Sequence, residues 1–234
     1  MRDIVIVQHE PSVPPGLIGL VAAEAGAAVT VFEAWRDDMW PAAGEIAGLV
    51  VLGGTMNVDE IAKHPFLGRS RALMGDAMKQ GVPTLGVCLG AQMMARVLGA
   101  PVRRAGERNA VFSTLELTEE GSNDPLTAPF DGLEVLQFHE DTFEIPDGAV
   151  PLATSVHSSL AQAFRYGDNA YAIQFHFEVD RPILKGWIED IGHHEMLEGW
   201  GRDPSDLLGH ADRVLDRQAL AGARLMEGFL ALGR

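Results

Sequence analysis

The residues of this chain best suited to covalent chemistry centre on one thiol. Cys88 is the only cysteine in the sequence, and it lies in the segment GVCLGAQ between Gly86 and Gly90. The G-x-nucleophile-x-G spacing is typical of a tight strand-to-helix turn that exposes a nucleophile at the carboxyl edge of a sheet. The N-terminus of the following helix would favour the thiolate. A lone cysteine is also a common small buried residue, so the motif alone leaves both interpretations open.

A nucleophilic thiol needs a general base, and the base needs a group that orients it. Among the eight histidines, His176 lies in a strand-like segment, QFHFEVD, with a carboxylate two residues later at Glu178. Residues i and i+2 of a strand share a face, so we expect Glu178 to orient the ring of His176 while Phe177 packs the other way. The alternative is a histidine at a sheet edge beside a solvated glutamate.

A third element of such a site is a set of hydrogen-bond donors that stabilise the negative charge developing on the substrate oxygen. The segment VVLGGTMN places Gly53 and Gly54 at the end of a strand-like run. If that strand lies beside the cysteine strand in a parallel sheet, backbone N–H groups of the glycine pair and of Leu89 could form an oxyanion hole. By itself, a pair of glycines is more typical of an ordinary turn.

The elements that must position these residues alternate in the order βαβαβ. Strands that are apolar along nearly their whole length are typical of a parallel sheet covered by helices. Strands are predicted at 3–7, 28–32, 48–54 and 84–87, with helices at 16–27, 66–80 and 89–98. Further strands are expected at 115–118, 132–138 and 170–179. A helical tail at 205–232 extends what we predict to be one domain over 1–234.

The composition narrows the possible partners and location. The chain holds 18 Lys+Arg and 33 Asp+Glu residues, and its net charge of −15 argues against nucleic-acid or anionic-membrane partners. A single cysteine excludes an intramolecular disulfide and fits a reducing compartment, so we predict a cytoplasmic location. We expect no signal peptide and no membrane span, because no suitable apolar run is present.

Together these motifs resemble those of the class I glutamine amidotransferases, which carry a Cys-His-Glu triad. LGGTM, GVCLGAQ and QFHFEV are similar to the oxyanion, nucleophile and His-x-Glu motifs of that family, in the same order. The resemblance runs from about Asp3 to about Asp180. VIVQHEPSVPPGLI, HEDTFEIP and QAFRYG are most similar to stand-alone relatives of the amidotransferase domain of GMP synthase. The implied fold is flavodoxin-like: an open, mostly parallel α/β sheet with helices on both faces.

The resemblance implies a glutamine amidotransferase-like hydrolase that releases ammonia from the glutamine side chain. Cys88 would attack the amide carbon to form a thioester, and the amides of Gly54 and Leu89 would hold the oxyanion. His176 would transfer protons and Glu178 would orient its ring.

The resemblance also implies substrate contacts beyond the triad. Gln92 would bind the substrate, and His139, Glu140 and Asp141 would lie in a loop beside its amino-acid end. No cofactor or metal is implied. The segment 193–195 (His-His-Glu) is too closely spaced for the H-E-x-x-H zinc motif, and we expect it at the surface.

Two positions depart from the family pattern. Phe177 replaces a proline, and Glu140 replaces a frequent glycine. Two like charges at ~4 Å interact by about 4 kcal/mol at an effective dielectric near 20. Glu140 could therefore weaken the binding of free glutamine, or it could instead meet the α-ammonium group or turn into solvent. An alternative substrate is another γ-glutamyl compound that carries an amine.

Other interpretations remain open at this point. A non-catalytic binding or regulatory protein can share the same fold. A cysteine peptidase or stress protein on a flavodoxin-like scaffold is disfavoured, because these often have histidine where this chain has Leu89. No P-loop pattern is present. An ammonia-accepting synthetase, if one is used, is therefore expected to be a separate polypeptide.

Overall fold

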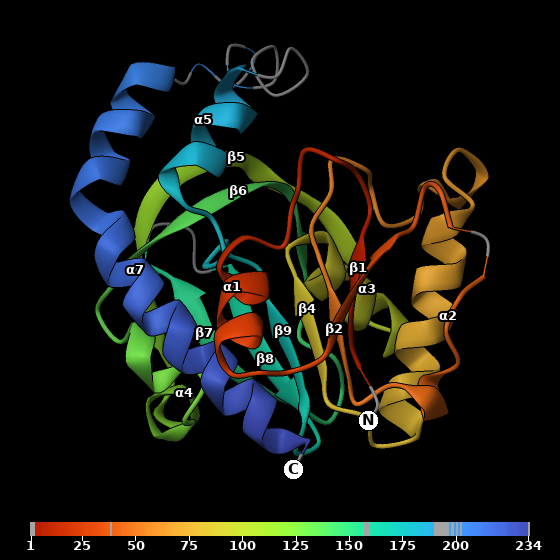
Figure 1. Cartoon of the computed structure of the whole chain (residues 1–234). Helices are drawn as coiled ribbons and strands as arrows, with labels where there is room; N and C mark the ends of the chain where they lie inside the picture. Colours follow the sequence, from red (N-terminus) through yellow and green to blue (C-terminus); the bar gives the residue numbers. More distant parts are fainter. Residues whose placement is uncertain are drawn as a thin grey trace.

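The chain is described by a computed structural model over residues 3–37, 39–156, 160–189 and 203–233, with residues 197, 199 and 201. Side chains of residues 107–109 are outside this description. The described residues form a nine-stranded sheet in the order β2-β1-β3-β4-β9-β8-β7-β5-β6 (Figure 1). The segment 193–195 lies outside the described residues.

Five neighbouring strands of this sheet run parallel, as the apolar segments predicted. They are β2 (Val29–Glu33), β1 (Ile4–Gln8), β3 (Gly48–Val51), β4 (Thr84–Val87) and β9 (Ala170–Ile173). All of them except the edge strand β2 are buried along their whole length. Side chains of a strand alternate between the two faces, so a doubly covered sheet needs apolar residues at every position.

Two hydrophobic cores lie on opposite faces of the parallel strands. Ile4 and Ile6 point into one core, which also holds side chains of α1 (Gly16–Glu24) and α7 (Pro204–Leu232). Val5 and Val7 point into the other, with α2 (Phe66–Lys79) and α3 (Leu89–Val97). The prediction of an open, mostly parallel sheet with helices on both faces is confirmed around these strands.

Four strands continue the sheet in antiparallel fashion beyond β9. They are β8 (Ala161–Tyr166), β7 (Ala149–Ser155), β5 (Val102–Leu117) and β6 (Glu134–Phe143). The sequence predicted only short pieces of β5 and β6 and missed β7 and β8. Pro151 within β7 and polar residues along β8 obscure the apolar pattern. The long β5–β6 pair arches over the molecule in Figure 1.

Two expectations about strands are wrong in detail. The strand predicted at 170–179 ends at Ile173, so His176 and Glu178 lie in irregular chain after β9. The segment from His139 to Asp141, expected to be a loop, lies inside β6. Pairing with β5 over most of its length keeps β6 extended through these polar residues.

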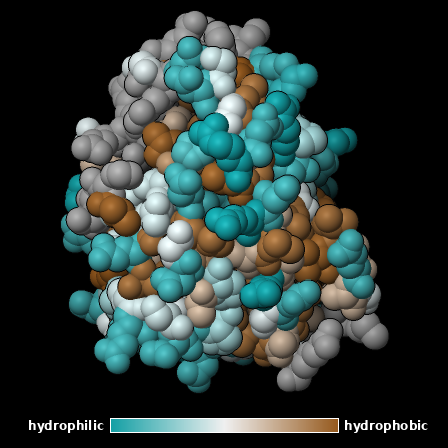
Figure 2. Space-filling model, turned by 90° about the vertical axis from the view of Figure 1, so that its left-hand side faces the viewer, coloured by the Kyte–Doolittle hydropathy of each residue, from teal (hydrophilic) through white to brown (hydrophobic). Residues whose placement is uncertain are grey.

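The C-terminal helix α7 packs along the molecule rather than standing free (Figure 1). Of the apolar residues in the predicted tail, nine are buried, namely Leu207, Ala211, Val214, Leu215, Ala221, Leu225, Met226, Phe229 and Leu230. Leu208 is half-buried, and Leu220 is 69% exposed. The side of the molecule that carries α7 shows many hydrophilic side chains (Figure 2). The apolar stripe of α7 therefore serves mainly to cover the sheet.

Smaller elements complete the described chain. They are α4 (Glu119–Asn123), α5 (Arg181–Glu189), and the 3-10 turns η1 (Ala43–Glu45), η2 (Glu60–Ala62) and η3 (Ala128–Phe130). Among the described helices, none is both long and apolar enough to cross a membrane.

Candidate active site

Cys88 lies in a strained turn between β4 and α3. Its backbone has φ 52° and ψ −106°, and no other described non-glycine residue has a positive φ. An added Cβ at Gly86 would come within 2.4 Å of the Gly90 carbonyl oxygen. One at Gly90 would come within 2.0 Å of the Val51 carbonyl oxygen. Both glycines are therefore required for α3 to pack against β3 directly after the thiol, and strain of this kind is common at active sites.

His176 and Glu178 form a buried pair behind the thiol. The Nδ1 atom of His176 lies 2.7 Å from Oε1 of Glu178, and both side chains are almost fully buried. The ring of Trp187, from α5, meets the His176 ring edge-on at a centroid distance of 4.9 Å. The indole of Trp187 donates in turn to the Ser12 carbonyl oxygen at 2.6 Å. These contacts hold the imidazole in one orientation although β9 has already ended.

The electrostatic surroundings favour the protonated form of His176. Burial by itself lowers the pKa of this histidine. Electrostatic interactions and hydrogen bonds with Glu178 and with the Cys88 sulfur outweigh burial and hold the pKa of His176 well above its usual value. An added Cβ at Gly53 would lie 3.3 Å from His176 Cε1 and 3.5 Å from Cys88 Cβ. The thiol and the imidazole therefore meet on the same side of the sheet.

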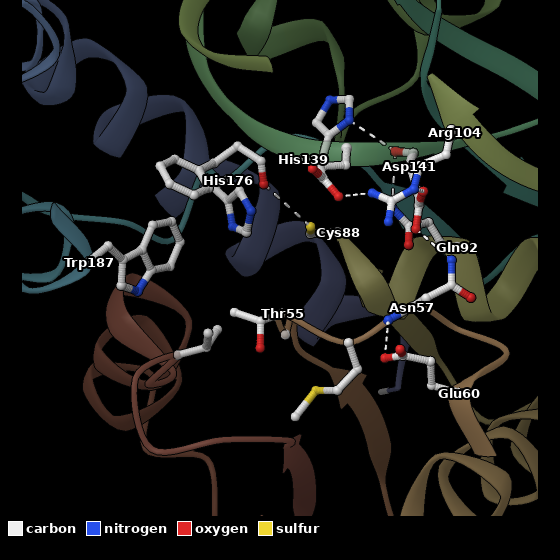
Figure 3. A pocket seen from close by; sticks show the side chains of 15 residues that line it. Thr55, Asn57, Glu60, Cys88, Gln92, Arg104, His139, Asp141, His176 and Trp187 are labelled. Carbon is white, nitrogen blue, oxygen red and sulfur yellow. Dashed lines mark hydrogen bonds and ion pairs between the residues drawn. The ribbon is translucent and has the colours of Figure 1, made fainter. Parts of the chain in front are cut away.

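Cys88 and His176 face a cavity of about 140 Å³ (Figure 3). Most of the residues that the sequence assigned to the site line this cavity. They are Gly54, Cys88, Gln92, His139, Glu140, Asp141 and His176. Glu178 lies behind His176, and Leu89 is the first residue of α3. The structure thus brings together residues from the ends of β3, β4 and β9 and from the middle of β6.

Two residues that follow β1 hold the glycine pair. The ring of His9 contacts the Gly53 carbonyl oxygen at 3.3 Å through Nδ1 and the Ser70 hydroxyl at 3.0 Å through Nε2. Burial lowers the pKa of His9 to about 4, so its ring is neutral at pH 7. The Glu10 carboxylate accepts from the Thr55 N–H at 2.6 Å and from its hydroxyl at 2.9 Å. Contacts with His9 on one side and Glu10 on the other therefore fix the position of the loop that carries Gly54.

The wall opposite Trp187 is built around Asp141 (Figure 3). The Gln92 amide donates to the Asp141 carbonyl oxygen at 3.1 Å, and Nδ1 of His139 contacts the same oxygen at 3.0 Å. The Asn57 amide donates to the Asp141 carboxylate at 2.6 Å. Burial and the nearby positive charge of His176 lower the pKa of His139 to about 4, so this ring is also neutral at pH 7.

Glu140 does not extend alone into solvent. Its carboxylate pairs with the guanidinium of Arg104, from β5, which also lies 3.4 Å from the Asp141 carboxylate. The negative charge of Glu140 is therefore compensated by Arg104 and does not act alone on the cavity. Phe177, the other departure from the family pattern, is fully buried and packs edge-on against Phe130 at 6.4 Å, away from the cavity.

Sequence reasoning missed several residues that line the cavity. They are Arg104, Trp187 and the neighbouring residues Asn57 and Glu60, which come from three different segments. Asn57 follows the glycine pair closely and could have been proposed from that position. Arg104 and Trp187 carry no motif, and only the folding of β5 and α5 over the sheet brings them to the site.

Three comparisons show which known proteins this chain is similar to. The family model described as glutamine amidotransferase class-I matches residues 20–182. A protein of Salmonella typhimurium described as glutamine amidotransferase-like, YfeJ, is 31% identical over 166 residues, covering 69% of each chain. A GMP synthase (glutamine-hydrolyzing) of Lactococcus lactis is 39% identical over 108 residues, which cover 44% of this chain and 20% of that protein.

A solved structure extends the similarity to almost the whole chain. The crystal structure of a glutamine amidotransferase from Thermotoga maritima superposes with a TM-score of 0.88 at 30% identity, covering 98% of both chains. The resemblance inferred from the motifs is confirmed, including the similarity to GMP synthase. With the family model matching more than half of the sequence, the chain belongs to the class-I glutamine amidotransferase family.

Proposed function

We propose that this chain hydrolyses the side-chain amide of glutamine to glutamate and ammonia through a thioester on Cys88. The observation that carries the proposal is the buried constellation at the strained turn. Cys88 and His176 face one cavity, and Glu178 lies 2.7 Å behind the His176 ring. A structural cysteine would need neither the strained backbone nor an oriented imidazole beside it.

In the first half of the reaction, the Cys88 thiolate attacks the amide carbon and the carbonyl oxygen becomes an oxyanion. The backbone N–H groups of Gly54 and Leu89 stabilise this charge. An added Cβ at Gly54 would lie 3.0 Å from the Leu89 side chain, so the two residues are neighbours. His176 gives its proton to the departing nitrogen, the C–N bond breaks, and ammonia leaves behind a γ-glutamyl thioester.

In the second half, the now neutral His176 takes a proton from water. The resulting hydroxide attacks the thioester carbon, the C–S bond breaks, and the Cys88 thiolate and protonated His176 are restored. The product carboxyl group loses its proton to solvent, where ammonia takes it up. Glu178 orients the ring and stabilises its charged form in both halves.

The direct test is to incubate the purified chain with L-glutamine and to quantify glutamate and ammonia. We expect equal amounts of both products from the wild-type chain and none above background from Cys88→Ala. Binding of glutamine without release of glutamate would refute the hydrolase and favour the non-catalytic binding protein that shares this fold.

The ammonia acceptor is proposed to be a separate synthetase. The GMP synthase relative is far longer than the matched segment, which covers only 20% of it. If the isolated chain already turns glutamine over rapidly, dependence on a synthetase partner is refuted. If turnover is slow, addition of candidate synthetases with their substrates should raise it.

A further inference from the structure

The guanidinium of Arg104 lines the catalytic cavity beside two carboxylates. The side chain of Arg104 is 67% exposed, and its guanidinium contacts both the Glu140 carboxylate and the less exposed Asp141 carboxylate. Arg104 lies directly opposite Asp141 in the β5–β6 register. The register shifts between Arg104 and Asn109, so Arg104 stands at the last regular pair before this irregularity. The cavity wall therefore presents a guanidinium and two carboxylates side by side (Figure 3).

This charged group lines the same cavity as Cys88 and adjoins Gln92. Gln92 follows Cys88 by one helical turn, a rise of about 6 Å. Its amide donates to the Asp141 carbonyl oxygen at 3.1 Å. In glutamine, three carbon–carbon bonds of about 1.5 Å separate the amide carbon from the α-carbon. A glutamine whose amide carbon is at Cys88 therefore has its α-carbon elsewhere in the same cavity, which Arg104 and Asp141 also line.

The charges of this wall complement a free α-amino acid. A guanidinium binds a carboxylate through paired N–H groups, and carboxylates accept hydrogen bonds from an ammonium. Because Arg104 is mostly exposed, its side chain has room to turn from Glu140 toward an incoming carboxylate. Glu140 and Asp141 would then face the α-ammonium group, whose positive charge replaces that of the guanidinium.

We propose that Arg104 binds the α-carboxylate of the substrate while Glu140 and Asp141 bind its α-ammonium group. The substrate class is then γ-glutamyl amides in which both α groups are free, and glutamine within a peptide is excluded. The inference rests on the proposed hydrolysis for the placement of the amide carbon at Cys88.

Arg103 provides a matched control for Arg104. It is the adjacent residue on β5, so its side chain points to the opposite face. Its guanidinium lies 3.7 Å from the Glu144 carboxylate, and it is not among the residues that line the cavity. Arg103→Gln and Arg104→Gln therefore remove the same charge from neighbouring positions of one strand.

The experiment compares three amides that differ only in their α groups. They are L-glutamine, 4-aminobutanamide, which lacks the α-carboxylate, and glutaramic acid, which lacks the α-amino group. Dissociation constants are measured by calorimetry on full-length Cys88→Ala, alone and combined with Arg104→Gln, Glu140→Gln or Arg103→Gln. KM and kcat for glutamine are measured on the same substitutions with Cys88 intact.

A charge-assisted hydrogen bond contributes about 1.5–3 kcal/mol, so Arg104→Gln should weaken glutamine binding about tenfold or more. It should not weaken the binding of 4-aminobutanamide, because that amide has no carboxylate for Arg104 to bind. Glu140→Gln should weaken the binding of glutamine and should not weaken the binding of glutaramic acid. Arg103→Gln should change none of the three, and Arg104→Gln should raise KM without lowering kcat.

Several results would overturn the proposal. Equal weakening of glutamine and 4-aminobutanamide by Arg104→Gln would show a merely structural ion pair. Unchanged or tighter glutamine binding in Arg104→Gln or Glu140→Gln would show that these side chains do not hold the α groups.

The binding and turnover measurements together separate this proposal from the proposed hydrolysis. If glutamine binds as expected but the chain with Cys88 intact releases no glutamate, the hydrolysis proposal fails and the recognition proposal stands. If hydrolysis proceeds and Arg104→Gln leaves KM unchanged, the recognition fails and hydrolysis stands. A Cys88→Ala chain that binds none of the amides refutes the recognition, whatever the turnover shows.

Discussion

Replacing His9 with glutamine should remove a large part of the acid sensitivity of this fold. His9 is fully buried under the glycine pair, where its ring contacts the Gly53 carbonyl oxygen and the Ser70 hydroxyl. A glutamine amide can donate to the same carbonyl and accept from the same hydroxyl. His9→Gln therefore keeps the polar contacts while it removes the group that titrates.

The magnitude follows from the pKa of His9, which burial lowers from 6.5 to about 4. Below pH 6.5 the unfolded chain binds a proton at this ring and the folded chain does not, so acid favours unfolding. The stability contributed by a neutral His9 is complete above pH 6.5 and falls as the pH drops toward 4. By linkage, the loss is about 2 kcal/mol at pH 5 and about 3 kcal/mol at pH 4.

The assay is urea unfolding of wild type and His9→Gln at pH 7.5, 6 and 5, followed by circular dichroism. We expect the free energy of unfolding of wild type to fall relative to that of His9→Gln by about 2 kcal/mol between pH 7.5 and 5. His139 and His176 titrate in both chains, so their contributions cancel in the comparison.

Ser70→Ala is the control, because it removes the hydroxyl partner and leaves the ring. It should lower the free energy of unfolding by about 1 kcal/mol at every pH, and the pH dependence of that free energy should stay the same as in wild type. If the difference in stability between wild type and His9→Gln is the same at all three pH values, the reasoning about His9 is refuted.

Two further predictions concern the triad and the turn before α3. Glu178→Gln should lower kcat for glutamine less than His176→Ala, because orienting the ring is secondary to proton transfer; steady-state kinetics with equal or reversed losses would contradict these roles. Gly90→Ala should destabilise the fold by several kcal/mol, since its Cβ would lie 2.0 Å from the Val51 carbonyl oxygen. Gly209→Ala, a helix position with open space around it, should be neutral or stabilising by up to about 1 kcal/mol in the same thermal unfolding experiment. Equal unfolding temperatures for the two glycine variants would argue against a required close approach at Gly90.

The parallel half of the fold and the thiol turn were readable from the sequence because their causes are local. Thr84–Val87 is apolar and followed directly by Cys88, two glycines flank the thiol, and α3 begins at Leu89. Each of these features depends on residues within a few positions of one another. His176 and Glu178 were also identified by their short separation, although the chain there is not the strand that was expected. Their pairing persists because packing against Trp187 replaces the strand in holding the ring.

The charged wall of the cavity was decided by the tertiary structure. The contact between Asn57 and Asp141 joins residues 84 positions apart, and Arg104 meets Glu140 only because β5 and β6 pair across the sheet. No local pattern marks Arg104 or Trp187, since an isolated arginine or tryptophan is equally compatible with a solvated surface. The sequence by itself identified Cys88, His176 and Glu178 as the candidate triad, together with the strands that precede them. Which charges line the cavity depended on the register between β5 and β6, and packing across the whole sheet sets that register.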